Sequence, residues 1–188
     1  MKKTEYLVLL RGINVGGKNL LKMNDLIKLF ESIGFTEIMT YIQSGNIIFK
    51  DFEKDRLIIK EKIEKALSQK MNVDIKVLII TFSEIKNIVD NNPNGFGEEN
   101  KRYKYDVIFL IEPLTTKAML KELTVKEGID EIYEGKKVFY IKRNIEKLTG
   151  SYIKKIMKTE MWKYITIRNW NTAKKLYELM LERKNTIK

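Results

Sequence analysis

The chain has 188 residues, no cysteine, no histidine and a formal net charge of +11. The two missing residue types exclude disulfides, thiolate catalysis and the commonest metal ligands, and they remove the usual general base near neutral pH. No apolar run reaches the length of a transmembrane helix or of a signal-peptide core. We therefore expect a cytoplasmic protein with no metal site and no membrane contact.

The first half of the sequence predicts the element order β-α-β-β-α-β, which is the ferredoxin-like arrangement. An apolar strand over residues 5–10 precedes a loop with three glycines over 11–21. The remaining expected elements are a helix from an Asn24 cap to Ser32, strands over 36–42 and 46–50, a helix over 55–71, a strand over 73–81 and a connecting helix over 84–91 capped by Ser83.

After a polar segment over residues 94–104, the same element order begins again. The expected elements are a strand over 105–111, a helix from Thr115 or Thr116 to 123, a hairpin over 131–142, a helix over 151–157, a short strand over 164–167 and a closing helix from Asn171 or Thr172 to about 184. The repeated order favours an internal duplication, although βαββα is common enough to arise independently.

These elements predict an α+β protein of two tandem ferredoxin-like βαββα(β) units. Residues 1–92 form the first unit with a connecting helix, and residues 93–188 form the second unit with a C-terminal helix. We expect the two units to make one compact structural unit, because a chain of this length suits one large domain or two small ones that share a core.

The basic excess lies in the last third of the chain. Residues 1–135 contain 21 basic and 21 acidic residues, whereas residues 136–188 contain 15 basic and 4 acidic residues. This asymmetry suggests contact with phosphates or another acidic surface. The alternative is a general bias of the sequence toward lysine, isoleucine and asparagine.

The segment from Gly12 to Asn19 approaches the P-loop spacing G-x-x-x-x-G-K after a strand. Asn19 replaces the magnesium-binding hydroxyl residue, and the helix does not begin at the lysine, so a nucleotide triphosphatase is disfavoured. A looser role remains, in which the loop cradles a phosphate or carboxylate with Arg11, Gly12, Asn14, Gly16, Gly17, Lys18 and Asn19. The alternative is that the glycines only permit tight turns.

Two further segments carry candidate ligand-binding side chains. Gln43, Ser44 and Asn46 form a turn, which is also ordinary hairpin chemistry, and we place it at the opposite sheet end from the Arg11 loop if the hairpin is tight. Arg168, Asn169 and Asn171 precede the last helix, whose N-terminus favours an anion. The alternative for this segment is a helix cap beside a core Trp170.

Four segments resemble an uncharacterised bacterial family, domain of unknown function 1697. They are Leu10-Arg-Gly-Ile-Asn-Val-Gly-Gly-Lys-Asn19, Thr40-Tyr-Ile-Gln-Ser-Gly-Asn-Ile-Ile-Phe49, Lys147-Leu-Thr-Gly-Ser-Tyr-Ile153 and Thr166-Ile-Arg-Asn-Trp-Asn-Thr172. The resemblance implies a compact α+β fold and no established activity. Gly150 is a departure, because a bulkier polar residue is expected there.

No paired carboxylates for acid–base work are evident, so the sequence identifies no catalytic residue and leaves the cofactor open. The expected function is binding of a phosphate-bearing ligand, a nucleotide or nucleic acid, in a cleft between the two units. One alternative is an enzyme that acts on a small anionic substrate, with Arg11 and Lys18 as electrostatic clamps. Another is a structural or interaction protein, and the sequence leaves the oligomeric state open.

Overall fold

The computed structural model describes residues 3–15, 17, 20–122, 128–151 and 153–186, without the side chains of residues 149 and 154. The chain divides into two compact units, one formed by Met1–Ile85 with Leu176–Lys188 and the other by Lys86–Lys175. The end of the chain therefore belongs to the first unit, whereas the sequence grouped it with the second.

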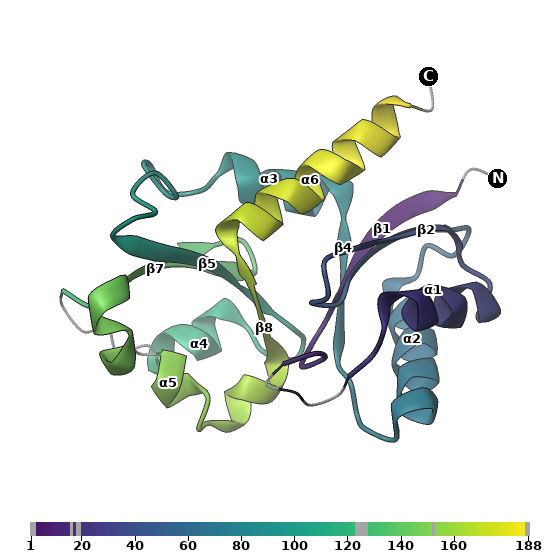
Figure 1. Ribbon diagram of the computed structural model, residues 1–188, viewed down its shortest axis with the longest axis horizontal. Coiled ribbons are helices and arrows are strands. Elements are labelled where there is room, and N and C mark those ends of the chain that lie inside the picture. The colour runs from purple at the N-terminus through teal and green to yellow at the C-terminus, as the bar shows by residue number, and fades with distance from the viewer. Residues whose placement is uncertain (1–2, 16, 18–19, 123–127, 152, 187–188) are drawn as a thin grey trace. The chain divides into compact units, whose positions relative to one another are not determined.

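The first unit contains a four-stranded antiparallel sheet. Its strands are β1 (Thr4–Leu10), β2 (Thr36–Tyr41), β3 (Asn46–Asp51) and β4 (Val77–Thr81), in the order β2-β3-β1-β4. The helices α1 (Met23–Ser32) and α2 (Arg56–Met71) lie on one face of this sheet (Figure 1). The arrangement is the predicted ferredoxin-like order.

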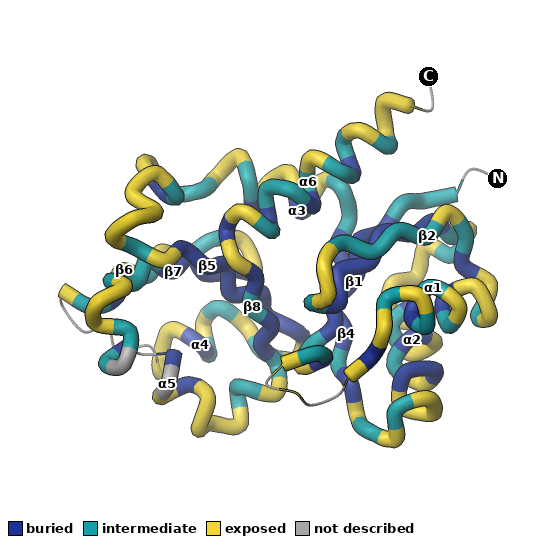
Figure 2. Tube along the Cα trace, viewed as in Figure 1, coloured by how far each residue is buried: buried dark blue, intermediate teal, exposed yellow. Residues whose placement is uncertain are grey.

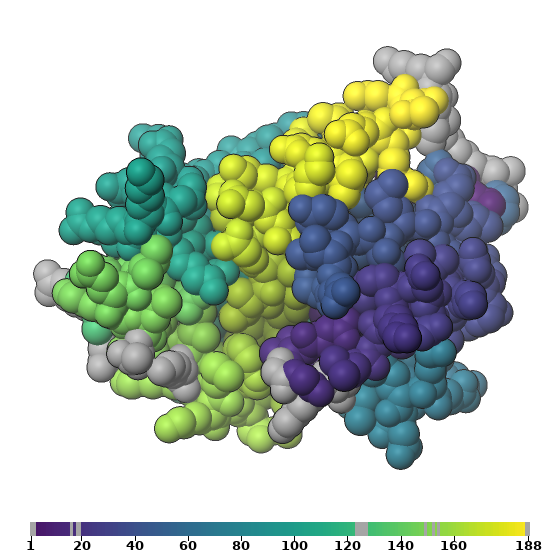
Figure 3. Space-filling view, in the orientation of Figure 1, coloured from purple at the N-terminus to yellow at the C-terminus, as the bar shows by residue number. Residues whose placement is uncertain are grey.

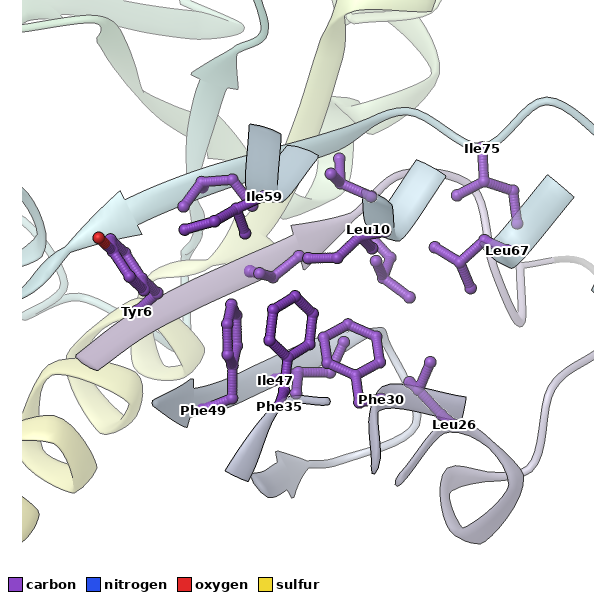
Figure 4. Close-up of a cluster of buried hydrophobic side chains, with 14 of the residues drawn as sticks. Tyr6, Leu10, Leu26, Phe30, Phe35, Ile47, Phe49, Ile59, Leu67 and Ile75 are labelled. Carbon is purple, nitrogen blue, oxygen red and sulfur yellow. The ribbon is translucent and has the colours of Figure 1, made fainter. Parts of the chain in front are cut away.

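Alternation along the strands places the core of the first unit between the sheet and its two helices. Tyr6, Val8 and Leu10 of β1 belong to this core, as do the aromatic rings of Phe30, Phe35 and Phe49 (Figure 4). The centroids of Phe35 and Phe49 lie 4.2 Å apart. Leu7 and Leu9, which alternate with the core residues, are also buried, so β1 is buried on both faces from Tyr6 to Leu10. Figure 2 shows this strand in the colour of buried residues.

The second unit repeats this architecture. Its strands are β5 (Tyr103–Leu110), β6 (Asp130–Gly135), β7 (Val138–Asn144) and β8 (Ile165–Asn169), in the antiparallel order β6-β7-β5-β8. The helices α4 (Thr116–Glu122) and α5 (Ile153–Ile156) contribute Met119, Ile153 and Ile156 to its core. α5 is shorter than the predicted helix over 151–157, and two 3₁₀ helices, Ile145–Gly150 and Glu160–Tyr164, flank it.

Equivalent backbone hydrogen bonds recur at one end of both sheets. In the first unit, the amides of Leu10 and Arg11 donate to the carbonyls of Gly45 and Lys76, at 2.8 and 3.0 Å. In the second unit, the amides of Leu110 and Ile111 donate to the carbonyls of Lys137 and Tyr164, at 3.3 and 2.8 Å. Strand order and hydrogen bonding both recur with an offset of 100 residues in the first strand, which supports internal duplication.

A helix follows the last strand of each sheet directly, namely α3 (Phe82–Asp90) after β4 and α6 (Trp170–Asn185) after β8. Thr81 caps α3, because its hydroxyl accepts from the Glu84 amide while the Glu84 carboxylate accepts from the Thr81 amide. Asn169 caps α6, because its Oδ1 accepts from the Asn171 amide at 3.0 Å. The predicted caps were wrong because, in each case, the last strand residue is itself the cap.

Within the described part of the chain, no helix has both the length and the apolar character needed to cross a bilayer.

Candidate functional site

Asn14 joins the glycine-rich loop to the turn between β2 and β3. Its Nδ2 donates to the carbonyl oxygens of Leu21 and Gln43, at 2.9 and 2.8 Å, and its Oδ1 accepts from the Leu21 amide at 2.8 Å. The backbone of Asn14 is left-handed, with φ of 53°, which asparagine tolerates better than most residues. Both amide protons of this candidate ligand residue are therefore engaged within the protein.

The loop and the turn lie at the same end of the sheet, so the prediction of opposite ends was wrong. β1 and β2 are both antiparallel to β3, which lies between them, and they are therefore parallel to each other. Parallel strands end at the same edge of a sheet, which places the residues after β1 beside the residues after β2. The pairing of Leu9 with Asn46 fixes this alignment.

The turn itself is tightly packed. Gly45 has φ of 70°, and a Cβ atom there would lie 2.7 Å from Leu10 Cβ and 2.8 Å from Ile13 Cδ1. Asn46 is completely buried, and its Nδ2 donates to the Tyr41 carbonyl and to Ser44 Oγ, at 3.0 and 2.8 Å. These contacts give Asn46 and Ser44 a role in holding the turn.

A groove of about 930 Å³ opens beside this junction. It is lined by Asn14, Leu20, Leu21, Lys22, Met23, Asn24, Asp25, Gln43, Lys70 and Met71, all from the first unit. The early part of the chain, drawn in purple, forms part of the molecular surface in Figure 3. Lys22, Asn24, Gln43 and Lys70 are exposed, and within the described residues their side chains make no hydrogen bond or ion pair.

The N-terminus of α1 forms one wall of the groove. The helix begins at Met23, and Lys22 holds the N-cap position with no side-chain hydrogen bond, so the prediction of Asn24 as the cap was wrong. The first intrahelical bond runs from the Leu26 amide to the Lys22 carbonyl. The amides of the first turn therefore have no intrahelical acceptor and point out of the helix end.

The other candidates in the glycine-rich loop are only partly described. Arg11 is half-buried, and desolvation lowers its pKa. Gly12 has φ of 71° with open space around its Cβ position, so the left-handed backbone rather than close packing requires glycine there. Gly17 is exposed. Gly16, Lys18 and Asn19 lie outside the described residues.

The Arg168 segment lies in the second unit. Arg168 is buried, its Nη1 donates to Thr166 Oγ1 at 2.8 Å and to the Ile167 carbonyl at 2.9 Å, and desolvation lowers its pKa to about 10. Asn169 Nδ2 donates to the Tyr105 carbonyl at 3.0 Å, in addition to its capping bond. Asn171 is exposed in the first turn of α6.

Trp170 has the core role that the sequence left as an alternative. Its side chain is buried, and its ring makes edge contacts with Phe96 and Tyr140, with centroids 5.3 and 6.3 Å apart. Gly97 leaves room for this ring, since a Cβ there would lie 2.4 Å from Trp170 Cδ1. Trp170 therefore packs in the core of the second unit against Phe96, Tyr140 and Gly97.

Sequence reasoning missed Lys22 and Lys70 as groove residues, and also the buried ion pair between Asp106 and Arg143. The topology contains a signal for Lys70. Because β4 is antiparallel to β1, the end of α2 that leads into β4 lies at the same sheet end as the start of α1. Among the described residues, no three acidic side chains gather as they would around a metal ion.

Comparison with known proteins gives a family and a structural relative. The sequence pattern of the family described as "Protein of unknown function (DUF1697)" matches residues 3–140. The structure of the conserved bacterial protein SP0830 from Streptococcus pneumoniae is similar, with a TM-score of 0.79, 26% sequence identity and coverage of 95% of this chain and 98% of that one. No curated protein matches. The chain therefore belongs to the family of proteins of unknown function DUF1697.

Proposed function

We propose that the first unit binds a phosphate-bearing ligand in the groove at the N-terminus of α1. The observation that carries the proposal is the helix end without a side-chain cap, which lines the groove together with two lysines. Open amides and the positive end of the helix dipole both favour an anion at that position. A groove of about 930 Å³ also falls within the range of small-molecule sites.

The charges of the lining favour an anion moderately. Lys22 and Lys70 contribute two positive charges and Asp25 contributes one negative charge, which leaves the lining with a net charge of +1. Neither lysine forms an ion pair within the described residues, so both ammonium groups are available to a ligand. Each contact with a doubly charged phosphate adds about 1 kcal/mol at an exposed site of this kind.

Titration calorimetry with pyrophosphate at low salt tests the proposal. We expect saturable binding by the full chain, weakened about threefold to tenfold by Lys70→Gln. Lys65→Gln is the matched control, because Lys65 is an exposed lysine of the same helix outside the groove lining. Absence of binding at low salt, or equal losses in the two variants, contradicts the proposal.

A nucleic acid is the second candidate ligand, and a separate observation favours it. The net charge of +11 arises within residues 136–188, where Lys155 and Lys158 are exposed around α5. Backbone phosphates attract such lysines without regard to base sequence. Binding of a single-stranded oligonucleotide that falls steeply with salt and is lost in Lys155→Gln/Lys158→Gln supports this candidate; binding that is unchanged in the double variant removes it.

A further inference from the structure

The groove of the first unit has features that a phosphate group alone leaves unused. Besides its charged residues, it is lined by the apolar side chains of Leu20, Met23 and Met71. Leu20 is 73% exposed, and together with the two methionines it gives the groove apolar surface. A ligand that only presents phosphate would leave this apolar surface in water.

Further apolar surface surrounds the same junction. Val15 is 65% exposed and Ile42 is 50% exposed. Val15 follows Asn14 in the chain, Leu20 precedes Leu21, and Ile42 precedes Gln43, and the hydrogen bonds of Asn14 tie these neighbours together. Three large apolar side chains are therefore presented by chain segments joined at one hydrogen-bonded point.

The groove also offers side-chain amides. Asn24 and Gln43 line it, and within the described residues neither side-chain amide is hydrogen-bonded. An amide has both donors and an acceptor, which is the combination that the edge of a nucleobase requires. The sulfur atoms of Met23 and Met71 add favourable contacts with an aromatic ring.

We infer that the ligand of this groove is a nucleoside phosphate of low molecular weight. Its phosphates bind Lys22, Lys70 and the N-terminus of α1, and its base packs on Leu20 and the two methionines while an edge reaches Asn24 or Gln43. The inference rests on the proposed function for the position of the anion. A free nucleotide rather than a polymer fits, because the volume of about 930 Å³ suits one small molecule.

The experiment compares pyrophosphate with the 5′-diphosphates of adenosine, cytidine, guanosine and uridine, so that the charged group stays the same and only the nucleoside changes. Titration calorimetry with the full chain is expected to show at least one diphosphate binding about tenfold more tightly than pyrophosphate. Leu20→Ser then weakens that nucleotide about tenfold and leaves pyrophosphate within about twofold, since it removes apolar contact area but no charge. Lys70→Gln weakens both.

Leu57→Ser is the matched control. Leu57 is 60% exposed, lies in α2 and does not line the groove, so its loss leaves both ligands unaffected. Because all the substituted side chains are exposed, urea midpoints of the variants should match that of the unchanged chain.

The outcomes separate the two proposals. Pyrophosphate binding with no tighter binding of any nucleoside diphosphate overturns the inference and leaves the anion site standing. Equal nucleotide binding by Leu20→Ser and the unchanged chain also overturns it. Failure of both pyrophosphate and the diphosphates to bind overturns the proposed function as well.

Discussion

Asn14→Ala should destabilise the first unit, because it removes the side chain that joins the glycine-rich loop to the turn between β2 and β3. The side chain makes three hydrogen bonds, to both backbone groups of Leu21 and to the Gln43 carbonyl. At about 1 kcal/mol each, discounted because one bond is exposed, their loss costs about 2 kcal/mol. The left-handed backbone adds about 1 kcal/mol for alanine.

Asn14→Gly separates these two contributions. It removes the same hydrogen bonds but adopts φ of 53° without strain, so it should be about 1 kcal/mol more stable than Asn14→Ala. Ser32→Ala is the control in the same unit, because Ser32 makes a single exposed hydrogen bond to the Leu29 carbonyl. We expect its unfolding free energy to change by about 0.5 kcal/mol or less.

The assay is urea unfolding followed by circular dichroism. Tryptophan fluorescence is unsuitable, because Trp162 and Trp170 both belong to the second unit. A loss below about 1 kcal/mol for Asn14→Ala, or a glycine variant less stable than the alanine variant, would refute this account of the junction. Affinity for pyrophosphate should fall in both Asn14 variants, since Leu21 and Gln43 are no longer tied together.

Four other substitutions test particular contacts. Asn169→Ala should cost about 1 to 2 kcal/mol in urea unfolding while Asn171→Ala costs about 0.5 or less, because only Asn169 caps α6. Gly45→Ala should cost about 2 kcal/mol or more, since both its positive φ and the neighbouring atoms oppose a Cβ. Burial raises the pKa of Tyr140 from 10.0 to about 12. As the pH rises from 10 to 12, this tyrosine loses its proton in the unfolded state before it does so in the folded state, and the free energy of unfolding therefore falls. Between pH 9 and pH 11, Tyr140→Phe should lose less free energy of unfolding than the unchanged chain does. An equal loss in the two proteins contradicts the attribution of this pH dependence to Tyr140. Asp25→Asn should raise pyrophosphate affinity severalfold, because it removes the groove's one negative charge among the described lining residues, yet lower stability by about 0.5 kcal/mol through the helix dipole.

The strands and the longer helices could be predicted from the sequence because apolar runs of strand length alternate with longer segments typical of helices. The run from Tyr6 to Leu10 is apolar at every position, which predicts a buried strand, and all five residues are buried in the structure. The helix starts were harder, since Thr81 and Asn169 end a strand and cap a helix at once. A search for caps after the strand therefore placed these helices too late.

The groove could be predicted only in part, because it is assembled by topology. The polar loop and the turn at Gln43 were visible as motifs, but their proximity depends on β3 lying between two parallel strands. Lys22 and Lys70 belong to no motif, and they contribute through their places at the start of α1 and the end of α2. The proximity of Lys22 and Lys70 can therefore be inferred only after the order of the strands in the sheet is known.

The two units share a scaffold, and this makes the difference at one sheet end informative. Twelve residues, 11–22, connect β1 to α1 in the first unit, whereas only five, 111–115, connect β5 to α4 in the second. In the shorter connection, Glu112 forms an ion pair at 3.2 Å with Lys137 of the β6–β7 turn. In the longer one, Asn14 reaches the equivalent turn through the Gln43 carbonyl, and the exposed Leu20 and Lys22 border a groove. Duplicated strands require neither the added length nor the exposed leucine, and both features belong to the ligand site that we propose.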